Sequence, residues 1–203
     1  MMTHKLAAVS LFALALAACS GGSSGGGGSY GAGDPNLAAS NMGSGPIDPF
    51  LADGTAVLKA LDAIAAKSGT PLRVTDLTAD RNNGLTVNVQ EPANHVNVDQ
   101  YVVAPDGTLT GPTPVKMMSM DGGPITAAKV DRQAFDPKSI PFAKLADTAR
   151  EAIAKSNMTD ARVSQWEIAG IGPDDRRFIY LDASRGRPAA EIDAQLKIVH
   201  MSF

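Results

Sequence analysis

Three methionines lie close together in the middle of the chain, and their thioethers could hold a soft metal ion. Met117, Met118 and Met120 follow Lys116 and precede Asp121. Thioether sulfur selects Cu(I), so this cluster raises a copper-binding hypothesis. Methionine also fills irregular core gaps and contacts partner proteins well, and we favour this simpler interpretation. The sequence therefore predicts no metal site and no cofactor, with the three methionines as the alternative.

Residues that could perform acid–base or nucleophilic catalysis are few and scattered. His95 follows Asn94 in a polar turn, His200 lies near the C-terminus, and Asp174 and Asp175 are adjacent in a charged loop. A nucleophile needs a base that is itself oriented, and neighbouring side chains in a solvated turn seldom have shifted pKa values. Phosphate-binding glycine motifs are absent from the sequence. We therefore predict that the protein is not an enzyme.

The overall charge argues against nucleic-acid binding. The chain has 203 residues, with 18 Lys and Arg against 21 Asp and Glu, and a formal net charge of -3. Proteins that bind nucleic acids neutralise phosphates with a surplus of basic residues, which this chain lacks. Its hydrophobic content of 44% is ordinary for a soluble domain. We therefore predict no nucleic-acid partner.

The N-terminus has the features of a secretory signal. A short basic region precedes an apolar run over residues 6–18, which is too short to span a bilayer. The run ends in Leu-Ala-Ala-Cys at Cys19, the only cysteine of the chain, and this resembles the bacterial lipobox. In lipoproteins that cysteine becomes the acylated first residue of the mature chain. The alternative is an ordinary signal peptide cleaved after Ala17 or Ala18.

The lipobox resemblance implies both a membrane anchor and a location. Residues 1–18 are expected to be the lipoprotein signal peptide, and Cys19 is expected to carry palmitate or a related acyl chain. Ser20 stands where Asp would favour the inner membrane of Gram-negative bacteria. The resemblance thus implies the bacterial cell envelope, at the periplasmic face of the outer membrane. Residues 19–46, which include ten Gly and six Ser, are expected to form a disordered tether.

The rest of the chain is expected to be α+β, built from tandem repeats of a helix plus a three-stranded antiparallel sheet. Asp48-Pro49 recurs as Asp136-Pro137, and Lys67-Ser68 recurs as Lys155-Ser156 at the same offset. In each case a helical pattern gives way to the alternation typical of strands. The expected strands cover residues 72–77, 85–89, 96–104, 161–169, 178–182 and 191–201. The expected units are a first α-β-β-β repeat over 47–115, a connector over 116–133 with a short strand near 125–130, and a second repeat over 134–203.

This order of elements resembles the PepSY domain. Residues 101–109 end a sheet in the manner of that domain, and residues 180–186 echo its Asp-Ala turn. The architecture is also similar to the tandem repeats of β-lactamase-inhibitor-protein-like folds. Both resemblances imply non-catalytic modules that bind or inhibit other envelope proteins.

The sequence therefore leads us to expect a membrane-anchored periplasmic lipoprotein that acts as a non-catalytic protein-binding module. Its partner is expected to be an envelope or secreted protein. The alternatives are an inhibitor or immunity protein against a secreted hydrolase or toxin, and a small-ligand or Cu(I) binder through Met117–Met120. Trp166 is expected in the core. The exposed sheet face and the C-terminal region of Leu196, Ile198 and Phe203 are the expected docking surfaces.

Overall fold

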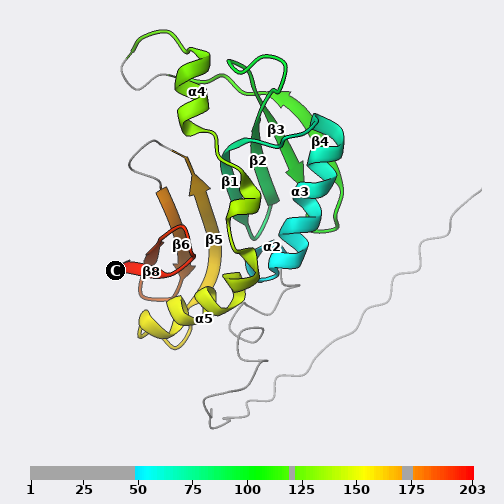
Figure 1. Cartoon of the computed structure of the whole chain (residues 1–203). Coiled ribbons are helices and arrows are strands. Elements are labelled where there is room, and N and C mark those ends of the chain that lie inside the picture. Colours follow the sequence, from blue (N-terminus) through cyan, green and yellow to red (C-terminus); the bar gives the residue numbers. More distant parts are fainter. Residues whose placement is uncertain (1–48, 119–121, 171–175) are drawn as a thin grey trace, which may run out of the picture. The chain divides into compact units, whose positions relative to one another are not determined.

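Eight strands form one continuous antiparallel sheet in the part of the chain that the computed structural model describes, residues 49–118, 122–170 and 176–203. The strand order across the sheet is β4-β3-β2-β1-β5-β6-β7-β8 (Figure 1). The strands are β1 (Val74–Asp80), β2 (Gly84–Gln90), β3 (Val98–Val103), β4 (Leu109–Pro114), β5 (Arg162–Ala169), β6 (Arg176–Asp182), β7 (Ala189–Ile192) and β8 (Ile198–Ser202).

The described helices are short, and most of them cover one face of this sheet (Figure 1). They are α2 (Pro49–Ala52), α3 (Gly54–Ser68), α4 (Ala127–Gln133) and α5 (Leu145–Lys155), with 3₁₀ turns at Pro137–Ser139 and Phe142–Lys144. Helices α2, α3 and α5 pack side by side on that face, whereas α4 lies near the end of the sheet where β1 begins (Figure 1).

Helix α3 begins and ends where its sequence provides caps. The Asp53 carboxylate accepts a hydrogen bond from the Thr55 backbone N–H at 2.8 Å, which supplies a partner for an otherwise unpaired N-terminal group. Gly69 ends the helix with φ of 102°, a conformation that costs glycine little. Val57, Leu61 and Ile64 fall on one side of the helix and are fully buried against the sheet.

The core lies between the helices and the sheet, and Trp166 of β5 is at its centre. The indole is fully buried, and its Nε1 donates to the Phe50 carbonyl oxygen of α2 at 2.7 Å. The Phe142 ring lies 5.9 Å from the Trp166 ring, between centroids. Buried indoles need a partner for their N–H, so this hydrogen bond ties α2 to the sheet. The expected core position of Trp166 is confirmed.

The expected architecture of tandem α-β-β-β repeats is wrong. Strands β1 and β5 pair directly, from Asp76 opposite Ala169 to Asp80 opposite Gln165. All eight strands therefore belong to one mostly β fold with a few short helices. Sequence periodicity reports which face of a strand is buried but not which distant strand it pairs with.

Three further details differ from the expectation. Residues 109–114 form an additional strand, β4, which accommodates Pro112 and Pro114 because it lies at the sheet edge. The expected strand near residues 125–130 is instead helix α4, capped by Thr126. The expected single strand over 191–201 is divided by a turn in which the Asp193 carboxylate accepts from backbone N–H groups.

Candidate functional site

The sheet face opposite the helices carries three rows of paired side chains. The central row runs from β3 to β8 as Val102, Thr86, Thr78, Glu167, Phe178, Glu191 and His200. The flanking rows are Gln100, Asn88, Asp76, Ala169 and Arg176 on one side, and Asp80, Gln165, Tyr180, Ala189 and Ser202 on the other. Directly opposed residues of neighbouring strands point to the same side of a sheet, so these side chains share one surface, called here the open face.

The open face is polar where the covered face is apolar. On β1, Leu77 and Ala79 point toward the helices and are fully buried, whereas Asp76 and Thr78 alternate with them and are half-buried. This is the alternation of a sheet packed on one side only. No helix within the described residues covers the central row (Figure 1).

Asp76 is the most perturbed carboxyl group of this surface. Burial raises its pKa to about 6, a hydrogen bond from the Thr78 hydroxyl at 3.1 Å lowers it in part, and the charge of Glu167 on β5 raises it further. Among the described residues, no lysine or arginine forms an ion pair with Asp76. A half-buried carboxylate without a cation costs folding energy, and such groups concentrate at functional sites.

Two aromatic rings adjoin the acidic centre. Phe178 and Tyr180 on β6 have ring centroids 5.8 Å apart and planes inclined by 30°. Phe178 lies opposite Glu167 on one side and Glu191 on the other. Both rings are half-buried, and Phe178 offers apolar contact area directly beside carboxylates, whereas Tyr180 lies opposite Gln165 and Ala189.

A cluster of hydrogen-bonded side chains lies where α4 meets the sheet. The Asp131 carboxylate of α4 accepts from the Gln90 side-chain amide at 2.7 Å and lies 2.8 Å from His95 Nδ1. The Gln90 hydrogen bond is the largest cause of a lowered pKa at Asp131, and His95 adds to it. Arg73 donates to the Asp131 and Ala134 backbone carbonyls. This cluster attaches α4 to the sheet.

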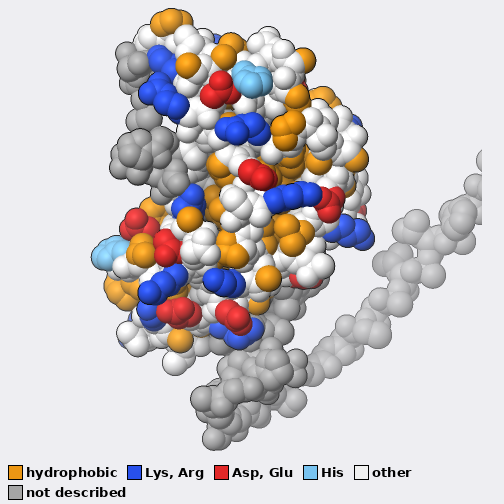
Figure 2. Space-filling view, viewed as in Figure 1, with side chains coloured by type: hydrophobic (Ala, Val, Ile, Leu, Met, Phe, Trp, Pro, Cys, Tyr) orange, Lys and Arg blue, Asp and Glu red, His pale blue; other side chains and the backbone are white. Residues whose placement is uncertain are grey.

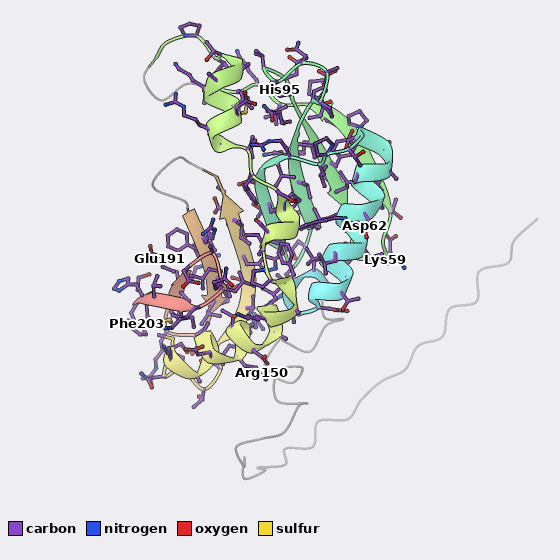
Figure 3. The ribbon with its side chains drawn as sticks, viewed as in Figure 1. Lys59, Asp62, His95, Arg150, Glu191 and Phe203 are labelled. Atoms are coloured by element: carbon purple, nitrogen blue, oxygen red, sulfur yellow. The ribbon has the colours of Figure 1, made fainter. Side chains whose placement is uncertain are left out.

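The histidines do not assemble a catalytic centre within the described residues. His95 has Asp131 as its side-chain partner, whereas His200 lies on β8, in the same row as Glu191. Figure 3 shows His95 and Glu191 well apart, at different ends of the sheet. In the described ranges, no group of three His, Cys, Asp or Glu side chains could hold a metal ion.

Several residues singled out from the sequence lie outside the described ranges: Cys19, Met120, Asp174 and Asp175. Met118 is 83% exposed, and Met117 lines a cavity of about 320 Å³ with Val96, Val98 and Ile125.

The expected docking region at the C-terminus is wrong for two of its three residues. Leu196 and Ile198 are buried in the core, whereas Phe203 at the end of β8 is 76% exposed (Figure 3). Leu196 has a positive φ of 59° and its carbonyl accepts a hydrogen bond from Thr148, which holds it inside. The exposed sheet face, which we expected as a docking surface together with this region, corresponds to the open face, and its role in docking stays a prediction.

The sequence reasoning missed Asp76, Glu167 and the Phe178–Tyr180 pair. The signal available was the alternation of polar and apolar residues on β1 and β5, which marks Asp76 and Glu167 as outward-facing. Only the pairing of β1 with β5 places these two residues together.

Comparisons with known proteins identify a fold but no family. No family model matches the chain, and no curated protein matches it in sequence. A solved structure of a candidate lipoprotein from Clostridium difficile 630 is similar, with a TM-score of 0.51 and 15% identity, covering 72% of this chain and 91% of that one. At this identity the likeness shows the fold alone, and these comparisons do not support the PepSY resemblance. In the part of the chain that the structure describes, no helix is long and apolar enough to cross a membrane.

Proposed function

We propose that this chain is a lipid-anchored protein of the bacterial cell envelope that binds another protein through its open face. The lipobox ending at Cys19 supports the anchor. The similar fold of a candidate lipoprotein is compatible with it. The partner is an envelope or secreted protein, because a tether at the membrane concentrates the folded part where such proteins act.

The observation that carries the binding role is the composition of the open face. It combines a perturbed carboxyl group at Asp76, a second carboxylate at Glu167 and the Phe178–Tyr180 ring pair. A partially buried carboxylate with no cation lowers stability, and proteins retain such local conflicts where a site serves function. Aromatic side chains beside polar groups are also the residues that anchor protein interfaces.

The proposed role is non-catalytic. Catalysis by an activated nucleophile needs a nucleophile, a base and an orienting group in mutual contact. His95 contacts Asp131, and Asp131 in turn contacts the Gln90 amide, so this cluster is explained by the attachment of α4. The proposed binding role has two forms. In one, the protein inhibits a secreted hydrolase or gives immunity to it; in the other, it assists the assembly of an envelope machine.

The anchor is tested by metabolic labelling with an alkyne-bearing fatty acid, using a Cys19→Ser variant as the control. We expect label on the wild-type protein and none on the variant, and co-fractionation of the wild type with outer membrane. Label that survives in Cys19→Ser would contradict acylation at this cysteine.

The binding surface is tested by photo-cross-linking in intact cells. A photoreactive amino acid at Gln100 or Thr86 lies on the open face, whereas one at Lys59 or Asp62 lies on α3, on the helix side (Figure 3). We expect a discrete cross-linked protein species from the open-face positions alone. Equal cross-linking from the α3 positions, or none from the open face, refutes the proposed binding surface.

A further inference from the structure

The centre of the open face carries carboxylates from three strands. Asp76 lies on β1, Glu167 on β5 and Glu191 on β7, all on the same surface. Asp80 belongs to the same face, but its carboxylate already accepts hydrogen bonds from the backbone N–H groups of Asn82 and Asn83. The first three carboxylates are therefore the ones available to an incoming group.

The two arginines that flank β1, Arg73 and Arg81, have side chains directed elsewhere. Arg73 donates to the backbone carbonyls of Asp131 and Ala134, and Arg81 donates to the Val163 carbonyl at 2.8 Å. On the helix side, by contrast, positive and negative side chains are interspersed (Figure 2). The three rows of the open face contain four carboxylates, Asp76, Asp80, Glu167 and Glu191, and one arginine, Arg176. Because the carboxylates outnumber the arginine, the face is complementary in charge to a cationic partner.

The rings beside the carboxylates favour a planar cation. Phe178 lies between Glu167 and Glu191 in the central row, and its ring is 5.8 Å from the Tyr180 ring. An aromatic face attracts a cation, and guanidinium both stacks on rings and offers several N–H donors to carboxylates. An ammonium group offers the charge without the flat surface.

We propose that the protein partner of the open face inserts an arginine side chain between Asp76 and Glu167, with its guanidinium against the Phe178 ring. This inference rests on the proposed function and specifies the chemistry of the partner. The raised pKa of Asp76 agrees with a carboxylate whose cation arrives from another molecule, since an opposite charge would favour its ionised form.

The test uses two short peptides that differ in one group. Both are acetylated and amidated Gly-X-Gly-X-Gly chains, with X as arginine in one and as citrulline, its uncharged isostere, in the other. Each is titrated into the purified full-length protein, and backbone amide shifts are recorded by NMR. The variants are Asp76→Asn and, as a matched control on the helix face, Asp62→Asn, whose exposed ion pair with Lys138 contributes little stability.

We expect the arginine peptide to shift amides of β1, β5 and β6 and the citrulline peptide to shift none. Asp76→Asn weakens binding about tenfold or more, because it removes a charge-assisted hydrogen bond, and Asp62→Asn leaves binding unchanged. Equal binding of the citrulline peptide, equal binding by Asp76→Asn, or shifts confined to other elements overturns the inference.

Failure of this inference is distinguishable from failure of the proposed function. If the open face cross-links to a protein in cells but the arginine peptide does not bind at Asp76, the inference fails and the binding role stands. If neither experiment shows contact at the open face, both fail. Arginine binding without any protein cross-link at the open face overturns both, because both require a protein partner.

Discussion

Replacing Asp76 by asparagine should stabilise the protein at neutral pH. Burial raises the pKa of Asp76 from 3.8 to about 6, so the folded state disfavours the ionised carboxylate. Because the folded state holds this proton more tightly than the unfolded state, stability falls as pH rises from the unfolded pKa through the folded pKa. The penalty is absent below about pH 4 and complete above about pH 7. Asparagine has nearly the same shape, carries no charge and still accepts a hydrogen bond from Thr78.

The size of the effect follows from the shift. About two pKa units at about 1.4 kcal/mol each give roughly 3 kcal/mol, and the partial exposure of Asp76 reduces this to about 1–3 kcal/mol. For a domain of this size, that corresponds to a rise in Tm of about 2–10 °C. Near pH 4 the variant and the wild type should have the same stability.

The measurement is urea unfolding followed by circular dichroism at several pH values between about 4 and 8. Glu191→Gln serves as the control, because Glu191 is an exposed carboxylate on the same face. A variant no more stable than wild type near pH 7.5 would refute the reasoning. A stability gain that is the same at every pH would refute it equally, since it could not come from ionisation.

Three further substitutions test the packing that supports the open face. Trp166→Phe should cost roughly 1–3 kcal/mol in urea unfolding, because it removes the indole N–H that donates to the buried Phe50 carbonyl oxygen; no change would show that the hydrogen bond is dispensable. Gly54→Ala should lower Tm although alanine favours helices, because a Cβ there would lie 1.9 Å from the Phe142 carbonyl oxygen, and a raised Tm would contradict this close contact. Thr148→Val should cost roughly 1–2 kcal/mol by removing the hydroxyl that donates to the Leu196 carbonyl at 2.7 Å, with Thr55→Val, at an exposed site, as the comparison.

Local signals predicted individual elements well. Asp53 and Gly69 flank an apolar pattern of helical period, and helix α3 lies between them. Alternation over residues 85–89 predicts β2, because buried and exposed side chains alternate along a strand covered on one side. These features depend on residues that are neighbours in the sequence.

The edge strand β4 and the helix α4 were mispredicted. Pro112 and Pro114 argue against a strand, and β4 exists because an edge position leaves proline's missing N–H without consequence. The segment near residues 125–130 is rich in residues compatible with a strand, yet the Thr126 cap and contacts to β1 make it helix α4. In both places the tertiary surroundings outweighed local preference.

The sequence by itself determined which side chains of each strand face the core, and it contains Asp53 and Gly69, the caps between which helix α3 lies. It also contains the lipobox-like segment at Cys19 on which the proposed anchor depends. Only the tertiary structure decided that Thr78 lies opposite Glu167, and therefore that Asp76 and Glu167 share one surface. The reason is that helix caps and alternation follow from interactions between neighbours, whereas backbone hydrogen bonds between β1 and β5 form only after the long intervening chain has folded back.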